Sequence, residues 1–192
     1  MASDIPPSRG TSNPVRRTAD LRRGRISEPG STYFVTFATL HRLPALQSAS
    51  ALRAAHAACA RLVDDHDVAE LCATIMPEHV HLCFRLGERL SVDRVVAKWR
   101  TKVRQGLPTL RWQANFFEHR VRSNEKRERY DWYIFMNPYH AGLVPLDQTW
   151  SGWWCSEGAA AGLLAKALPG PLPQPAWLSL LKSQLPHLVL GE

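Results

Sequence analysis

Hydrophobic and polar positions follow two periods along the middle of the chain. Apolar stretches rich in β-branched and aromatic residues predict strands, and apolar residues spaced by three or four predict helices. The link Met76-Pro77-Glu78 is so short that the strands on either side of it are expected to form a hairpin. The strands are predicted at 32–38, 68–76, 80–86 and 116–121, and the helices at 48–63, 91–106 and 123–136.

The last predicted helix has polar residues at both ends. Ser123 or Asn124 can cap its start, Asn137 is expected at its end, and Pro138 follows just beyond. The order strand, helix, strand, strand, helix, strand, helix predicts an α+β fold, a ferredoxin-like or RRM-like split β-α-β sandwich. Its central antiparallel sheet is expected to carry helices packed on one face and to leave the other face open for ligands.

A length of 192 residues fits one domain with tails. We expect the domain at 31–155, preceded by a flexible basic segment at 1–30 that contains six arginines. Residues 156–192 predict a Pro-rich tail whose last stretch could form a short helix. Three tryptophans are expected to fill an edge of the core: Trp150, Trp153 and Trp154.

Charge is concentrated in one part of the chain. The net charge is +7, and residues 94–129 alone hold eleven Lys or Arg against three Glu. Arg94, Lys98 and Lys102 recur every four residues and form a basic row on one face of the second helix. A basic segment of this kind is typical of a protein with a polyanionic partner, although a solvated helix face gives the same pattern.

Cysteine usage and hydropathy bear on the cellular compartment. The four cysteines form no C-x-x-C pair, which predicts reduced, structural thiols. The chain has no apolar run of about 18 residues, and its start has no apolar signal core. The sequence therefore predicts a cytoplasmic protein without a membrane span.

His79 and His81 flank one apolar residue at the start of the third predicted strand. Residues i and i+2 of a strand point to the same face, so the two imidazoles can act as a pair of ligands for one divalent metal ion. Two ordinary histidines on a solvated edge strand would give the same pattern. Tyr133 and Asn137 share a helix face, where both could reach one metal-bound phosphate. The alternative interpretation is that Tyr133 is an ordinary core tyrosine and that Asn137 ends the helix before Pro138.

Four blocks of sequence, in one order, make the combination specific. They are RRGR at 22–25 followed by PGSTYFVTF at 29–37, HVH at 79–81, WQ at 112–113 followed by FFEHRVR at 116–122, and YIFMNPYHAGLV at 133–144. Together they resemble the REP-associated tyrosine transposases. These belong to the HUH family of single-strand nucleases and are relatives of the single-strand transposases of bacterial insertion sequences. The resemblance spans roughly residues 20–155. It departs from the family at three positions, where Glu78 replaces Asn, Glu118 replaces Asp and His140 replaces Arg.

The resemblance implies a metal-dependent endonuclease and strand transferase for single-stranded DNA. Tyr133 would be the nucleophile and would form a 5′-phosphotyrosine intermediate, with Tyr130 as the alternative nucleophile. His79, His81 and Asn137 would hold Mg²⁺ or Mn²⁺.

The implied partner is hairpin DNA of the repetitive extragenic palindrome type, with single-stranded flanks. Such a protein would be bacterial and cytoplasmic, and associated with the nucleoid when bound to DNA; monomer and homodimer both stay open. Glu118 and His119 would support the ligands or the sheet. The expected DNA contacts are Arg22, Arg23, Arg25, Arg94, Lys98, Lys102, Arg120 and Arg122, with Trp112 stacking on unpaired bases.

Two other functions use some of the same features. A non-catalytic, RRM-like nucleic-acid-binding module would need the basic helices and the sheet, and the histidines would then be incidental. Metal hydrolases of the amidohydrolase type also use H-x-H, but on barrels of about 250 residues, which exceeds this chain.

Overall fold

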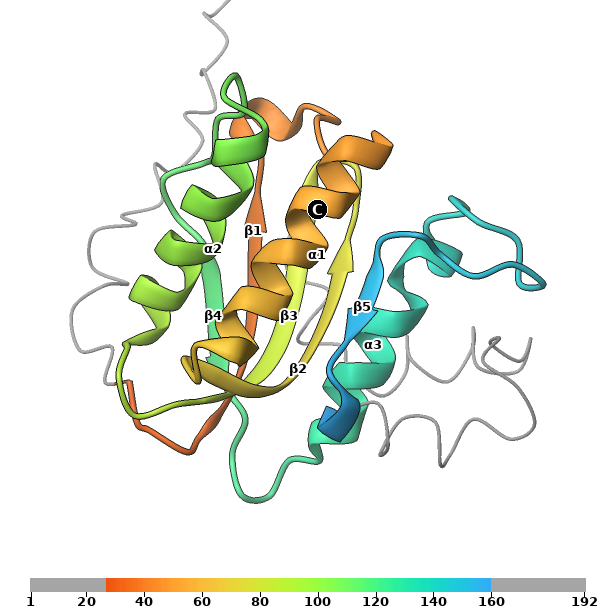
Figure 1. The fold of residues 1–192 in the computed structure, drawn as a ribbon. Helices are drawn as coiled ribbons and strands as arrows, with labels where there is room; N and C mark the ends of the chain where they lie inside the picture. Colours follow the sequence, from red (N-terminus) through yellow and green to blue (C-terminus); the bar gives the residue numbers. More distant parts are fainter. Residues whose placement is uncertain (1–26, 160–192) are drawn as a thin grey trace, which may run out of the picture.

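The computed structural model describes residues 27–159, which form one antiparallel sheet of five strands with three α-helices (Figure 1). The strand order is β4-β1-β3-β2-β5. This confirms the predicted α+β, ferredoxin-like class. The elements are β1 Thr32–Ala38, a 3-10 helix η2 Leu40–Arg42, α1 Ala49–Asp64, β2 Val68–Ile75, β3 His79–Leu86, α2 Val92–Gly106, β4 Phe117–Arg120, α3 Arg127–His140 and β5 Trp153–Cys155.

Some predictions fall outside the described residues. The basic lead-in with Arg22, Arg23 and Arg25, and most of the predicted C-terminal tail, lie in 1–26 and 160–192. Within residues 27–159, no helix is long and apolar enough to cross a membrane.

The larger core lies between the sheet and the helices α1 and α2. Val35 and Phe37 of β1 both lie in this core, on the same face of the strand, because alternate strand residues share a face. From the helix side, α2 contributes the fully buried Trp99, whose indole lies edge-on to the Phe37 ring at 5.1 Å between centroids. Ser48 caps α1 by accepting a hydrogen bond from the Ala51 amide, as its polar side chain at the helix start favours.

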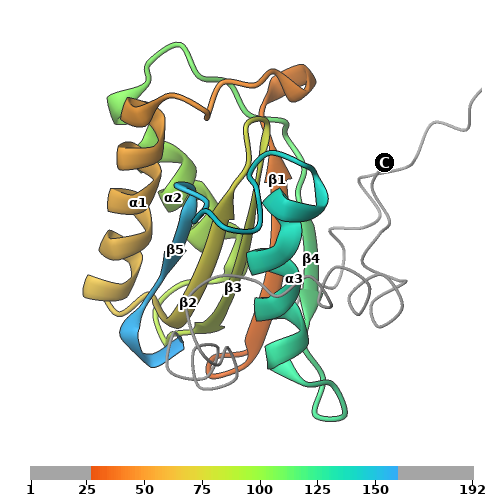
Figure 2. The same cartoon turned by 90° about the vertical axis from the view of Figure 1, so that its right-hand side faces the viewer.

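The sequence predicts that the opposite face of the sheet is open. In the structure this face carries α3 instead (Figure 2). Phe34 and Cys83 form a second apolar cluster there with Tyr130 and Ile134 of the helix. This side of α3 is too apolar to stay in water, so it covers the face that the sequence prediction left free. Helices therefore pack on both faces of the sheet, and α3 occupies the face opposite α1 and α2.

Helix α3 begins and ends later than predicted. It starts at Arg127 after Lys126, since Ser123 and Asn124 lie in a preceding turn, and it runs through Pro138 to His140. Proline lacks the amide that would bond to the carbonyl four residues earlier, here that of Ile134. The Thr74 hydroxyl of β2 donates a buried hydrogen bond of 2.7 Å to that carbonyl instead. The helix can therefore continue past the proline.

Thr74→Val is expected to lower the free energy of unfolding by about 1–3 kcal/mol, because it leaves the Ile134 carbonyl buried without a donor. Urea denaturation followed by tryptophan fluorescence measures the change. In a Pro138→Ala background the restored amide can bond to Ile134, so the same Thr74→Val substitution should cost clearly less. An equal cost in both backgrounds would contradict this account of the helix.

The fifth strand was not predicted. Trp153–Cys155 pairs antiparallel with β2 at the edge of the sheet, and the Trp150 indole donates a hydrogen bond of 3.1 Å to the Ile75 carbonyl. The ring of Trp153 packs edge-on against Phe135 of α3, and Trp154 packs against the larger core. The tryptophans do lie at an edge of the core, as expected. Three residues are too few to show a strand period in the sequence.

Candidate metal and nucleophile site

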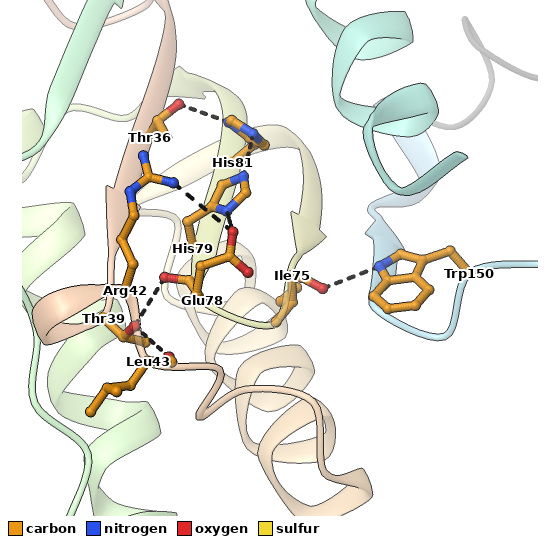
Figure 3. A network of polar contacts seen from close by, with 9 residues as sticks. All are labelled: Thr36, Thr39, Arg42, Leu43, Ile75, Glu78, His79, His81 and Trp150. Carbon is orange, nitrogen blue, oxygen red and sulfur yellow. Dashed lines mark hydrogen bonds and ion pairs between the residues drawn. The ribbon is translucent and has the colours of Figure 1, made fainter. Parts of the chain in front are cut away.

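His79 and His81 lie side by side at the start of β3, with their Nε2 atoms 3.0 Å apart (Figure 3). The strand runs between β1 and β2 in the middle of the sheet, and His81 is only 4% exposed. The alternative of two solvated histidines on an edge strand is therefore wrong. We call these two residues the imidazole pair.

The outer nitrogen of each imidazole has its own polar partner. His81 Nδ1 lies 2.7 Å from the Thr36 hydroxyl on β1, and His79 Nδ1 lies 2.7 Å from Glu78 Oε1. A carboxylate only accepts hydrogen bonds, so Nδ1 of His79 carries the proton, and in the neutral ring Nε2 keeps its lone pair. Partners on Nδ1 that leave Nε2 for a metal are the usual environment of metal-binding histidines.

Burial determines the charge of the imidazole pair. Burial lowers the pKa of His81 well below its ordinary value, and the neighbouring His79 and Arg42 lower it further. Burial also lowers the pKa of His79, although Glu78 opposes this shift. Both rings are therefore neutral near pH 7, which is the form of imidazole that binds metals.

Tyr133 of α3 lies next to the imidazole pair. Its ring is edge-on to His81, with 5.4 Å between centroids and 76° between the planes, and also packs edge-on against Phe34. Tyr133 is half-buried, and so is Asn137 one turn later on the same helix. The fold thus brings the phenol of Tyr133 next to two imidazoles that lie more than fifty residues earlier in the sequence.

Tyr130, the alternative nucleophile, lies in the core. It is 1% exposed and its ring stacks on that of His119 at 5.5 Å. Burial raises the pKa of its phenol, and the adjacent Glu125 carboxylate raises it further. His119 also lies 2.9 Å from Glu125 through Nε2, so its contacts support Tyr130 and the loop before α3.

The imidazole pair fits the requirements of a divalent ion. Two nitrogens that each lie about 2.1 Å from one ion, at right angles, are about 3.0 Å apart, and that is the separation of the two Nε2 atoms. Among residues 27–159, no group of three or more His, Cys, Asp or Glu side chains is arranged to hold a metal.

The basic row lies on the other side of the sheet from the imidazole pair. Arg94 and Lys102 are exposed on α2, which packs on the opposite face. Lys98 is engaged within the protein, because its ammonium group binds Asp65 at 2.7 Å and also contacts Asp67. The row is therefore separated from the imidazole pair by the sheet itself.

Two further expected site residues also belong to that side. Trp112 packs edge-on against Phe37 and Trp99 in the core, so its ring is not a free stacking surface for bases. Glu118 pairs in register with Val35, whose side chain points to α1 and α2. It thus lies on the face opposite the imidazole pair and cannot support those ligands directly.

The two arginines expected after Glu118 lie at the surface. Arg120 is exposed and forms an ion pair with Glu28. Arg122 is exposed, and its backbone amide donates a hydrogen bond of 2.7 Å to Glu125.

Sequence reasoning missed two of the residues that surround the imidazole pair, Thr36 and Arg42. Thr36 meets His81 because the two are register partners on β1 and β3, and strand register is not visible in one sequence. Arg42 reaches toward Glu78 from η2, where both His41 and Arg42 have positive φ values of 56° and 53°. Such backbone angles at non-glycine residues have no sequence signature here.

Comparisons with known proteins bear on the fold. No family model matches the chain, and no curated protein matches it. A solved structure of a REP-associated tyrosine transposase bound to a REP hairpin aligns with a TM-score of 0.60 at 20% identity, covering 76% of this chain and 86% of that one. A transposase candidate from Deinococcus radiodurans R1 aligns with a TM-score of 0.42 at 13% identity, over 53% and 87% of the two chains. The first alignment shows that this chain has the fold of a REP-associated tyrosine transposase.

Proposed function

We propose that the protein is a metal-dependent single-stranded DNA endonuclease and strand transferase of the transposase type. The observation that carries the proposal is the edge-on contact between the Tyr133 ring and His81, one member of the imidazole pair. It places the half-buried tyrosine of α3 beside the two imidazoles that we propose as metal ligands, within the fold of a REP-associated tyrosine transposase.

His79 and His81 would hold Mg²⁺ or Mn²⁺, and the side-chain oxygen of Asn137 would be a third ligand. A bound divalent ion neutralises negative charge that builds on the oxygens of the scissile phosphate. Mg²⁺ prefers oxygen ligands, so with two imidazoles Mn²⁺ is expected to serve at least as well in vitro.

Tyr133 is the proposed nucleophile. Its hydroxyl oxygen forms a bond to phosphorus, the P–O3′ bond breaks, and the phenol proton is balanced by the proton gained on the released 3′-OH. The product is a 5′-phosphotyrosine link that conserves the phosphodiester. A second 3′-OH can reverse the step, which suits strand transfer better than hydrolysis.

The proposed substrate is a DNA hairpin with single-stranded flanks. Two features support it: the net charge of +7, and the REP hairpin bound to the relative with the same fold. We still propose that Arg94 and Lys102 contact the phosphate backbone of the DNA. Because the sheet separates them from the imidazole pair, they would touch a part of the DNA away from the scissile phosphate.

A denaturing gel with hairpin oligonucleotides cut from the flanks of the gene tests this function. With Mn²⁺, the wild-type protein is expected to form an SDS-resistant adduct with the DNA, and EDTA is expected to prevent it. Tight binding to a hairpin with no adduct in either Mg²⁺ or Mn²⁺ would instead favour the non-catalytic binding module.

A further inference from the structure

We infer that Glu78 is a positioning residue for the proposed metal site. Its carboxylate holds the His79 imidazole in the tautomer and orientation that present Nε2 to a metal ion. This inference rests on the proposed function, and it concerns a residue at which the chain departs from the family that its sequence resembles.

The contact between Glu78 and His79 is short and partly shielded from water. Glu78 Oε1 lies 2.7 Å from His79 Nδ1, and the exposed fractions of the two side chains are 28% and 13%. A hydrogen bond to a charged acceptor is shorter and stronger than one between neutral groups. The two imidazoles therefore differ in their support, since the outer nitrogen of His81 faces the neutral hydroxyl of Thr36.

The backbone around Glu78 is fixed from the neighbouring segment. Its carbonyl accepts a hydrogen bond of 2.9 Å from the Thr39 amide, and the buried Thr39 hydroxyl lies 3.1 Å from the same carbonyl. The Met76 amide closes the hairpin by donating to the His79 carbonyl at 2.8 Å. Glu78 thus sits in a turn that is bonded on both sides, which a positioning residue requires.

Arg42 completes the arrangement around the carboxylate. Its guanidinium lies 4.0 Å from Glu78 Oε1, and Figure 3 shows it reaching back over Glu78 from η2. The left-handed backbone at His41 and Arg42 is unfavourable for residues other than glycine, so the surrounding contacts hold the turn in place.

This geometry also explains how the Glu78 carboxylate can be tolerated near a DNA phosphate at the proposed site. Nδ1 and Nε2 lie on different sides of the imidazole ring, so Oε1 binds the edge of His79 that faces away from the metal position. Its negative charge is directed at His79 and Arg42. A carboxylate on the outer nitrogen raises the basicity of the ligand, which an uncharged asparagine would not do to the same extent.

Mn²⁺ binding to the full-length protein tests the inference by isothermal titration calorimetry without DNA. Glu78→Gln keeps the length of the side chain and removes its charge, and is expected to weaken Mn²⁺ binding by about 10- to 100-fold. Glu88→Gln is the matched control, since Glu88 is exposed just beyond the other end of β3, and it should bind as the wild type does. Glu78→Asn, which places a turn-forming amide there, is the second variant if the glutamine variant does not fold.

The outcomes separate this inference from the proposed function. Equal Mn²⁺ affinity in the wild type and in the folded Glu78 variants would overturn the positioning role and leave the metal site standing. Failure of the wild type to bind Mn²⁺ at all, by calorimetry and by electron paramagnetic resonance, would overturn both.

Discussion

Replacing Tyr133 by phenylalanine is expected to abolish the covalent protein–DNA adduct, by at least about 10³-fold, because no other group can take over from a missing nucleophile. Phenylalanine retains the edge-on contacts with His81 and Phe34, so the fold and the packing of α3 should not change. The measurement is the amount of SDS-resistant adduct on a hairpin substrate in Mn²⁺. DNA binding under native conditions should persist.

Tyr130→Phe is the matched control for that substitution, since it removes a hydroxyl from the same helix three residues earlier. Its adduct yield should stay within a few-fold of the wild type. Loss of the contact with Glu125 is expected to lower the free energy of unfolding by about 1 kcal/mol. An adduct that survives Tyr133→Phe and disappears in Tyr130→Phe would reverse the assignment of the nucleophile.

His79→Ala is expected to reduce DNA cleavage by about 10²-fold or more, because it removes one of two nitrogens that the account assigns to the metal. The effect is measured in two ways: as the rate of DNA cleavage at increasing Mn²⁺ concentration, and as the affinity for Mn²⁺ by calorimetry. EDTA should reproduce the loss in the wild-type protein. Native DNA binding should change little, since the basic residues of α2 lie on the other face of the sheet.

His66→Asn serves as the control for His79→Ala. His66 is exposed after α1 and has a φ of 57°, a conformation that asparagine tolerates. Cleavage by this variant should match that of the wild type. If the wild type cleaves DNA unchanged in EDTA, and the His79→Ala variant cleaves it as well as the wild type does, the proposed role of the metal is wrong.

Local patterns in the sequence predict most of the sheet and of the two helices α1 and α2. Thr32–Ala38 is predicted to the residue, and the hairpin at 76–78 follows from the length of its link. The end of α3 depends on a non-local contact. Pro138 stays inside the helix because Thr74, sixty-four residues earlier, supplies the missing hydrogen bond. A three-residue edge strand at Trp153–Cys155 carries too short a pattern to be recognised.

The site divides in the same way. A shared strand face for His79 and His81 follows from their spacing alone, and their packing in the centre of the sheet agrees with it. The face on which α2 lies does not follow from spacing, and the structure places its basic row on the other side of the sheet from the imidazole pair. Trp112 was predicted from its type to bind DNA bases. Its contacts with Phe37 and Trp99 depend on the tertiary fold.

The role of Tyr133 as nucleophile is tested most directly by locating the covalent bond to DNA. A trapped adduct can be trimmed with nuclease and digested with trypsin, and residues 130–166 then form one peptide that contains Tyr130, Tyr133 and Tyr139. Fragmentation in the mass spectrometer separates the three positions. We expect a nucleotide mass on Tyr133 that requires Mn²⁺ during the reaction. A nucleotide on Tyr130 or Tyr139, or an unmodified peptide from protein that binds the hairpin tightly, would contradict it.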